Sequence, residues 1–420
     1  MLKNNGSLRV AMISEHGDPV SPLGGQQSGG QNVYVYELAR SLSKAGVFVD
    51  VFTRWDNRKA DEIVRFAKRA KVVRLKAGPR HFVSKDDFGP LMPEFVERFL
   101  EYSREKKVKY DLIHSHYYYS GWVGLRLRNI LKIPLIATFH SLGLLKKQAL
   151  GERDTSPSER TRIEKEIMQK ADLIISTSPQ EQEDMKQVYK EKKLKSAMIP
   201  PGVNLRRFSP LKTDWARRKL DLPNNKKIIV FAGKMERRKG SITLVEAIAK
   251  IEKIHPDLYK ELLVFLFTGD PRKTRRKEKR ELSARDELKS AINNLGKNPP
   301  VYLMRGLPQE TLHLYYGAAD VVAMPSYYEP FGMVAIEAMA TGTPVVASDV
   351  GGLKWTVKNG ETGYRFKPKD SNELASKIVK ILTGKKNKEF YFKCMRFARG
   401  NFGWQVIARQ VVAEYKKLIG

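Results

Sequence analysis

Short apolar runs alternate along the chain with longer segments whose apolar residues recur at helical spacing. In the segment 31–45, for example, Tyr34, Leu38 and Leu42 lie on one face of a helix. Such an alternation of strands and helices is typical of a parallel sheet that helices cover on both faces. The first half is predicted to hold strands at 8–14, 47–53, 111–114, 134–139 and 173–177, and helices at 31–45, 94–106, about 123–131 and 160–171.

The alternation stops at 198–202, Met-Ile-Pro-Pro-Gly, and then starts again. Proline and glycine interrupt both strands and helices, so we expect a hinge between two domains here. Strands are predicted at 227–233, 262–268, 300–304, 321–325 and 344–348, and helices at 242–254, 282–295, 312–317, 333–340 and 374–382. The predicted fold class is therefore α/β, with two facing, doubly wound, Rossmann-like domains and a ligand site in the cleft between them.

Composition excludes several classes of protein. The 420 residues are 41% hydrophobic and 29% charged, which is enough to build cores and argues against general disorder. The single cysteine, Cys394, excludes an intrachain disulfide and a cysteine-based zinc site. No run of 18 apolar residues predicts a spanning helix, and the polar first residues do not resemble a signal peptide, so we expect a cytoplasmic protein.

The net charge of +31, from 77 Lys and Arg against 46 Asp and Glu, would attract anions such as nucleotides, sugar phosphates, nucleic acids or anionic lipids. A surface of solvated lysines explains the charge equally well. The densest cluster, 272–289, mixes nine basic with four acidic residues and contains no aromatic residue. It therefore indicates a solvated helix rather than a platform for single-stranded nucleic acid.

Candidate ligand-binding residues in the first half follow predicted strands. Gly29 and Gly30 open the first helix, where bare backbone and helix N–H groups suit an anion, although an ordinary turn is the alternative. The pattern is not that of a dinucleotide-binding motif, and the long segment 15–27 suggests a lid. His140 ends a buried strand, where it could bind a ligand and change charge near neutral pH, or only cap a carbonyl. For His114 and His116 we favour ligand contact or a structural role over a metal pair.

The second half has two further candidate segments. The turn 233–240 is strongly basic and suits a diphosphate, although basic loops are usually only solvated. Glu329 and Glu337 flank a helix start, where acidic residues can simply complement the helix dipole. Carboxylates beside the exposed N–H groups of Phe331, Gly332 and Met333 would also provide the acceptors and donors that sugar hydroxyls need.

Taken in order, these motifs resemble the retaining family-4 glycosyltransferases of the GT-B fold, and the likeness covers essentially the whole chain. Segments 15–19, 29–35, 140–143, 162–166 and 325–339 are most similar to bacterial and cyanobacterial sucrose-phosphate synthases. Segments 114–117 and 350–353 also resemble inositol-phosphate N-acetylglucosaminyltransferases. The resemblance implies an acceptor-binding domain at 1–202, a nucleotide-sugar-binding domain at 203–400, and a last segment, 401–420, whose helix 404–418 crosses back onto the first domain. Packing of that helix within the second domain is the alternative.

The resemblance also implies roles for individual residues. Lys239 and Lys234 would hold the donor diphosphate, Glu337 the ribose, and Glu329 the donor sugar. The implied catalytic residues are His140, Lys239 and Glu329. The implied donor-binding residues are Gly30, Lys234, Lys239, Phe331, Gly332, Met333 and Glu337. The implied acceptor-binding residues are Gly29, Gln31, Lys85, Tyr117, Lys146 and Arg162.

The implied reaction is transfer of a hexose, taken to be glucose, from a nucleoside-diphosphate sugar to a phosphorylated sugar. Fructose 6-phosphate is the favoured acceptor, giving sucrose 6-phosphate; inositol phosphate, another sugar phosphate and a lipid are alternatives. Three cations, Lys85, Lys146 and Arg162, would be left unpaired by an uncharged sugar. The sequence contains no Asp-x-Asp pair, so we expect no metal and no cofactor, the nucleotide sugar being a substrate.

One residue departs from the family pattern, because Lys234 stands where arginine is usual. Lysine is a point charge without the bidentate fork of arginine, so leaving-group stabilisation would be weaker unless Arg237 or Arg238 contributes. An inactive homologue is therefore an open alternative. A weak association with anionic membranes and a nucleic-acid-binding protein also stay open, but we find no amphipathic membrane helix and no nucleic-acid motif. The oligomeric state is not predicted.

Overall fold

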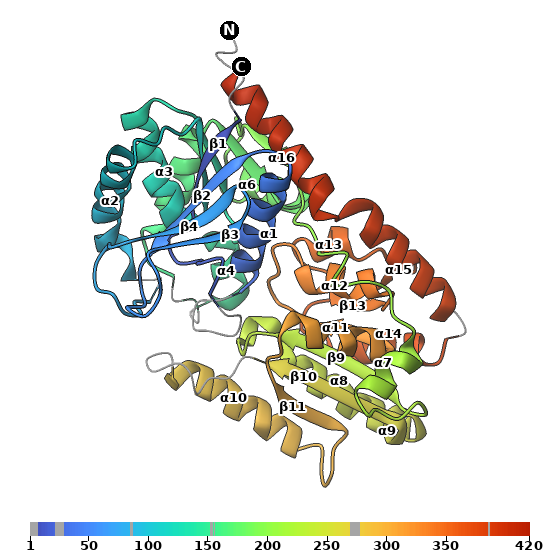
Figure 1. The fold of residues 1–420 in the computed structure, drawn as a ribbon. Helices are drawn as coiled ribbons and strands as arrows, with labels where there is room; N and C mark the ends of the chain where they lie inside the picture. Colours follow the sequence, from blue (N-terminus) through green and yellow to red (C-terminus); the bar gives the residue numbers. More distant parts are fainter. Residues whose placement is uncertain are drawn as a thin grey trace. The chain divides into compact units, whose positions relative to one another are not determined.

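The computed structural model describes residues 7–21, 29–84, 87–151, 154, 156–268, 278–384 and 387–420, and all their side chains except those of 278–283 and 387. The chain divides into two compact units (Figure 1). The first unit is Met1–Gly202 together with Trp404–Gly420, and the second is Val203–Gly403. The division falls at the end of the segment 198–202, where proline and glycine interrupt the sequence pattern.

The first unit is built on an eight-stranded sheet with the order β3-β4-β2-β1-β5-β6-β7-β8. All neighbouring strands are parallel except β3 and β4, which are antiparallel. The five predicted strands correspond to β1, β2, β5, β6 and β7 and are confirmed, whereas β3, β4 and β8 were not among the predicted strands. The strands are β1 (Arg9–Ile13), β2 (Phe48–Arg54), β3 (Ile63–Ala67), β4 (Ala70–Leu75), β5 (Leu112–His116), β6 (Leu135–Thr138), β7 (Leu173–Ser176) and β8 (Ser196–Met198).

Helices cover both faces of this sheet. Strand β1 shows why: Val10 and Met12 are buried in a core with α1 and α16, and Ala11 and Ile13 in a core with α2, α3 and α5. Helix α3 begins five residues earlier than predicted. The helices are α1 (Gly30–Lys44), α2 (Met92–Glu105), α3 (Tyr118–Leu131), α4 (Gly143–Leu150), α5 (Arg160–Lys170), α6 (Pro179–Gln187) and α16 (Trp404–Ile419).

The C-terminal helix α16 packs on α1 in the first unit, and Figure 1 draws the two side by side. It buries Trp404, Ile407, Val411 and Tyr415 in that core. Val406, on the same helix, is 40% exposed and does not belong to this core. The helix therefore completes the apolar cover of a sheet formed by residues about 200 positions or more earlier in the chain.

The second unit contains a six-stranded, wholly parallel sheet with the order β11-β10-β9-β12-β13-β14. Counted within the unit, this is the 3-2-1-4-5-6 order of a Rossmann sheet, in which the order reverses between β9 and β12. The five predicted strands are confirmed, and β14 was missed. The strands are β9 (Lys227–Gly233), β10 (Leu262–Thr268), β11 (Val301–Arg305), β12 (Val321–Met324), β13 (Val345–Ser348) and β14 (Gly363–Phe366).

Helices again form two layers over the sheet, with separate buried clusters on its two faces. The fold class predicted for each half, a doubly wound Rossmann-like unit, is thus confirmed. None of the described helices combines the length and apolar character that a membrane-spanning segment requires. The helices are α7 (Thr213–Lys219), α8 (Ser241–Ile254), α9 (Pro256–Glu261), α10 (Glu278–Asn293), α11 (Gln309–Ala318), α12 (Met333–Thr341), α13 (Leu353–Thr356), α14 (Ser371–Leu382) and α15 (Asn387–Asn401).

Candidate active site

In both units several candidate residues lie close to the point where the strand order reverses, which is the usual ligand position in an open α/β sheet. In the first unit this point lies between β1 and β5. Gln31, on the first turn of α1, bridges the two strand ends, because its Nε2 donates to Ser14 Oγ (3.1 Å) and to the carbonyl of His116 (3.4 Å). The N-terminus of α1 is thereby tied to the carboxyl edge of the sheet.

The first turn of α1 leaves backbone donors uncovered. The N–H of Gly29 donates to Asn32 Oδ1 (2.9 Å), but the N–H groups of Gly30, Gln31 and Asn32 have no acceptor among the residues that the structure describes. A Cβ added to Gly30 would meet no described atom within 4 Å. Packing therefore does not require glycine here, whereas the close approach of an anionic ligand would.

His140 follows β6 with a left-handed backbone (φ 61°) and is half-buried. Its Nε2 lies 3.0 Å from Nδ1 of His116, and its ring packs edge-on against Tyr34 at 4.8 Å between centroids. Burial, followed by the charges of His114 and His16, lowers the pKa of His140 to about 3. The prediction that His140 changes charge near neutral pH is therefore wrong, because its surroundings keep the ring neutral.

The two other strand-end histidines are buried. His114 is held from both ring nitrogens, with Nδ1 2.7 Å from the Tyr415 hydroxyl and Nε2 3.0 Å from Thr138 Oγ1. His114 is therefore structural, whereas His116 contacts His140, a candidate ligand-binding residue. Within the described ranges, no group of three or more His, Cys, Asp or Glu side chains is arranged to hold a metal ion.

The expected acceptor residue Tyr117 caps α3 with a positive φ of 86°, an uncommon conformation for an aromatic residue. Its hydroxyl accepts a hydrogen bond from Nη1 of Arg160 (3.2 Å). The same nitrogen lies 3.4 Å from Ser156 Oγ, which also accepts from Nζ of Lys146 (3.1 Å). Tyr117 and Lys146 therefore belong to one polar cluster, connected through Arg160 and Ser156.

The structure differs in two respects from the pocket of three cations, Lys85, Lys146 and Arg162, that was expected for the acceptor phosphate. Lys146 is not unpaired, since it forms an ion pair with Asp154 (2.9 Å), and this pair lowers the pKa of Asp154 although burial opposes the shift. Arg162 is exposed and makes no described contact with Tyr117 or Lys146, and Lys85 lies outside the described residues. The guanidinium beside Tyr117 belongs to Arg160, because residues two apart on a helix point in nearly opposite directions.

Two further residues of the first unit were missed. Glu15 is fully buried and accepts hydrogen bonds from Ser120 Oγ and from Nδ1 of His16 (2.7 Å). The ring of His16 packs edge-on against Tyr117 at 4.8 Å between centroids. Both residues lie in the segment 15–19, and their pairing next to Tyr117 depends on the tertiary fold.

In the second unit the reversal point lies between β9 and β12, and each strand is followed by a candidate segment. Lys239 ends a short 3₁₀ helix, η4 (Arg237–Lys239), and forms an ion pair with Glu329, which follows β12. Ser326 Oγ lies 3.4 Å from the same carboxylate oxygen. Residues expected to bind neighbouring parts of the donor are therefore in contact although 90 positions separate them.

The segment after Glu329 leads into the N-terminus of α12, where Phe331 and Gly332 are buried and Met333 is half-buried. The N–H groups of Phe331, Gly332 and Met333 have no acceptor in the described part of the chain. The Phe331 side chain is itself buried in the core, so only its backbone can serve a ligand. Gly351, whose φ is 46°, packs against the backbone of this segment. A Cβ added to this glycine would lie 2.1 Å from the carbonyl oxygen of Glu329, so no other residue fits.

The basic turn after β9 offers fewer available cations than its sequence suggests. Lys234 is exposed. Arg237 is bound by Glu287 of α10, and Arg238 donates to Glu236 (2.5 Å). Neither arginine could assist Lys234 without leaving its carboxylate.

Glu337, on α12, is 6% exposed and accepts a hydrogen bond from Gln309 Nε2 (3.2 Å). Burial raises its pKa to about 8, against smaller opposing effects of Tyr316, Gln309 and the charge of Arg207. The carboxyl group expected to hold the ribose is therefore largely protonated at neutral pH.

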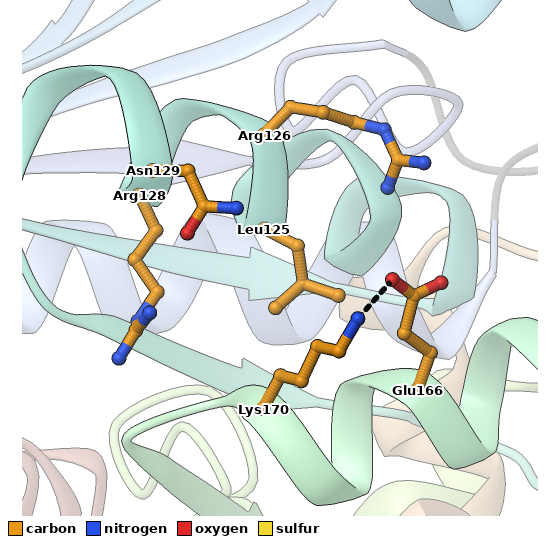
Figure 2. Close-up of a pocket in the computed structure, with 6 residues that line it drawn as sticks. All are labelled: Leu125, Arg126, Arg128, Asn129, Glu166 and Lys170. Atoms are coloured by element: carbon orange, nitrogen blue, oxygen red, sulfur yellow. Dashed lines mark hydrogen bonds and ion pairs between the residues drawn. The ribbon is translucent and has the colours of Figure 1, made fainter.

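A surface hollow of about 510 Å³ lies elsewhere on the first unit, between α3 and α5 (Figure 2). Two of its three cations are paired with carboxylates, Lys170 with Glu166 and Arg128 with Asp172, and the third, Arg126, donates to the carbonyl of Trp122 (3.2 Å). None of the candidate residues lines it, so we do not assign the site to this hollow.

Comparisons with known proteins agree with this arrangement. Residues 28–207 match the family Glycosyltransferase Family 4, and residues 213–394 match Glycosyl transferases group 1. The chain is 35% identical to a D-inositol 3-phosphate glycosyltransferase of Corynebacterium jeikeium, over 98% of this chain and 97% of the relative. It is 37% identical to a sucrose-phosphate synthase of Thermosynechococcus elongatus, with a TM-score of 0.89 over 98% and 99% of the two chains. The Anabaena protein HepE, crystallised with UDP and glucose, shares the fold at 21% identity and a TM-score of 0.72, over 98% and 100%.

Proposed function

We propose, from the premise that this chain belongs to the group 1 and family 4 glycosyltransferases of the GT-B fold, that it transfers glucose from a nucleoside-diphosphate sugar to a phosphorylated sugar. The favoured acceptor is fructose 6-phosphate, and the product would be sucrose 6-phosphate with the anomeric configuration of the donor retained. The enzyme would thus be a hexosyltransferase.

One observation supports the proposal most strongly, namely the Lys239–Glu329 ion pair. Glu329 is followed in the chain by N–H groups at the start of α12 that donate to no described residue. A nucleoside-diphosphate sugar presents two phosphates next to a ring of hydroxyl groups. Lys239 has the charge for the phosphates, and Glu329 has acceptor oxygens for the hydroxyls. The helix N–H groups supply neutral donors with a favourable dipole.

The chemistry assigned to the second unit is stabilisation of the leaving group. As the bond between the sugar and the diphosphate breaks, negative charge grows on the departing oxygen. Lys239 and Lys234 would hold the diphosphate during this step, which is how fixed cations lower such a barrier. Arg237 and Arg238 donate to Glu287 and Glu236, which are not candidate donor-binding residues, so we assign the two arginines no direct role. The carboxylate that binds Lys239 belongs to Glu329, which is itself expected to bind the donor sugar.

The acceptor assignment draws on the polar cluster of the first unit. Arg160, Tyr117 and Lys146 combine two cations with a hydroxyl, which suits a phosphate joined to a polyol. The pairing of Lys146 with Asp154 leaves this cluster less positive than three free cations would be. Arg160 is paired as well, with the buried carboxylate of Glu164 (2.7 Å), and is itself almost fully buried. We therefore assign Arg160 to the orientation of the Tyr117 hydroxyl, and keep Lys85, Lys146 and Arg162 as the candidates for binding the acceptor phosphate.

An inositol phosphate is the second candidate acceptor, and it has specific support. The curated relatives at 33–35% identity are named D-inositol 3-phosphate glycosyltransferases, whereas the solved structure at 37% identity is a sucrose-phosphate synthase. Both acceptors are phosphorylated polyols, so the donor assignments above are the same for either.

The acceptor panel is the direct test. The purified protein is incubated with UDP-glucose, ADP-glucose or UDP-N-acetylglucosamine against fructose 6-phosphate, fructose and D-inositol 3-phosphate, while nucleoside diphosphate release is measured. Release with fructose 6-phosphate and not with fructose supports the proposal. Release only with inositol phosphate moves the protein to the second candidate, and release with unphosphorylated fructose contradicts both.

We also propose that the reaction needs no divalent metal and no cofactor. The support is the cationic pair Lys234 and Lys239 at the diphosphate position, together with the lack of an Asp-x-Asp pair in the sequence. Turnover should therefore persist after treatment with EDTA. A loss of activity that Mg²⁺ or Mn²⁺ restores would overturn this part of the proposal.

A further inference from the structure

The contact between His116 and His140 restricts where each ring can carry its proton. Nδ1 of His116 and Nε2 of His140 are 3.0 Å apart, within hydrogen-bonding distance. The two rings are 5.2 Å apart between centroids, at the ends of the neighbouring strands β5 and β6. His140 is one of the catalytic residues that the family resemblance implies, and we assign it a contact with the sugar of the nucleotide sugar, so the inference rests on the proposed function.

Both rings are neutral under physiological conditions. Burial lowers the pKa of His140 to about 3, and it lowers the pKa of His116 well below its ordinary value, with His114 and His140 adding to the effect. A neutral imidazole carries one proton and leaves the other nitrogen as an acceptor. One of the two facing nitrogens must therefore donate and the other accept.

This requirement leaves two arrangements for the pair. If Nδ1 of His116 donates, Nε2 of His140 is bare and His140 carries its proton on Nδ1. If Nε2 of His140 donates, Nδ1 of His116 is bare and His116 carries its proton on Nε2. The tautomers of the two residues are therefore coupled: both rings are protonated on Nδ1, or both on Nε2.

The surroundings of His116 favour the first arrangement. His116 is fully buried, and its Nε2 has no hydrogen-bond partner among the described residues. A proton on that nitrogen would be a buried N–H donor without an acceptor, which folded proteins rarely tolerate. No such restriction acts on His140, which is half-buried and whose Nδ1 has no described partner.

We propose that His116 is a positioning residue that fixes His140 in the Nδ1-protonated tautomer. The Nδ1–H of His140 can then donate a hydrogen bond to the nucleotide sugar. His116 is itself held firmly in place. Its ring packs on His114 at 4.3 Å between centroids, and Tyr415 of α16 and Thr138 anchor His114. Its carbonyl accepts from Gln31 (3.4 Å). The C-terminal helix thereby contributes indirectly to the orientation of His140.

The tautomers can be read directly by ¹⁵N NMR of protein labelled at histidine, with the His140 signals assigned from a His140→Ala variant. The expected result is protonated Nδ1 and unprotonated Nε2 for both His116 and His140, unchanged between pH 6 and pH 8. Protonated Nε2 on both rings would overturn the proposal. This measurement does not depend on turnover, so it remains decisive even if no tested acceptor proves to be a substrate.

Two substitutions separate positioning from packing. In His116→Asn the amide nitrogen can still donate to Nε2 of His140, whereas His116→Leu keeps comparable bulk without a donor. We expect His116→Asn to keep the Nδ1 tautomer of His140 and kcat within about threefold, and His116→Leu to lose the tautomer and about tenfold in kcat, with the KM for the acceptor unchanged. Equal tautomers and equal kcat in the two variants would contradict the proposal.

Tyr415→Phe is the matched control, because it removes a buried hydroxyl from the same cluster without touching the His116–His140 contact. It should lower the melting temperature yet leave the ¹⁵N signals of His140 in the same tautomer. A tautomer change in this variant as large as that in His116→Leu would show that the cluster responds to any packing defect, and would overturn a specific role for His116.

Discussion

Glu337→Gln should make the second unit more stable at alkaline pH, although it removes a residue assigned to the nucleotide. Glu337 is 6% exposed, and burial raises its pKa to about 8. In the unfolded chain the same carboxyl group titrates at its ordinary value of 4.5. Between these two pH values the unfolded state has lost the proton and the folded state keeps it, so unfolding becomes more favourable as pH rises.

The size of the effect follows from the two pKa values. They differ by about 3.5 pH units, and each unit is worth about 1.36 kcal/mol, so ionisation costs the folded state about 5 kcal/mol by pH 9. Below pH 4.5 this cost is absent. Glutamine does not titrate, and its amide can keep the hydrogen bond with Gln309. The variant should therefore gain about 3–4 kcal/mol on the unsubstituted protein between pH 5 and pH 8.

Urea unfolding at pH 5, 6.5 and 8 measures this difference. Glu246→Gln is a suitable control, because it makes the same chemical change at an exposed position of the second unit, on α8, where no ion pair with a described residue is lost. A pH-dependent gain of less than about 1 kcal/mol for Glu337→Gln would refute the claim that Glu337 is buried in its protonated form.

Three further substitutions test the site. Gly30→Ala should leave the melting temperature unchanged, because an added Cβ meets no described atom within 4 Å. The same substitution should raise the KM for the nucleotide sugar about tenfold. A fall in melting temperature would show that packing requires this glycine. Lys239→Gln should lower kcat by a factor of about 10²–10³ with little change in the KM for the acceptor, since it removes the cation assigned to the leaving group and keeps Glu329. A change confined to the KM values would place Lys239 in substrate binding only. Arg160→Lys should lower the free energy of unfolding, measured in urea, by about 2–3 kcal/mol and raise the KM for fructose 6-phosphate. The reason is that lysine cannot bind the Tyr117 hydroxyl and the Glu164 carboxylate at the same time. An unchanged KM would remove Arg160 from the acceptor site.

The fold of both units was largely predictable because their central strands are buried on both faces and read as continuous apolar runs. β3 and β4 escaped prediction because they form the edge of the first sheet, where Ile63 is 40% exposed and charged residues interrupt the pattern. The order of the strands was not predictable from periodicity, since nothing in a strand's own residues specifies its neighbour.

The candidate site was predictable where chemistry follows directly from position in a strand–helix unit. Lys239 and Glu329 were both expected at strand ends, and the fold brings them into contact. Arg160 was missed in favour of Arg162, because the sequence pattern does not specify which face of α5 meets Tyr117. The titration of His140 and Glu337 was also unpredictable, since it depends on burial by segments far away in sequence.

The most direct test of the account is the structure of the product formed from UDP-glucose and fructose 6-phosphate. Proton NMR of the reaction mixture follows the anomeric signal of the transferred glucose. The account predicts a new disaccharide phosphate with an α-configured glucosyl group, formed together with one equivalent of UDP and strongly reduced in Lys239→Gln. UDP release that yields only free glucose, or a β-configured product, would contradict it.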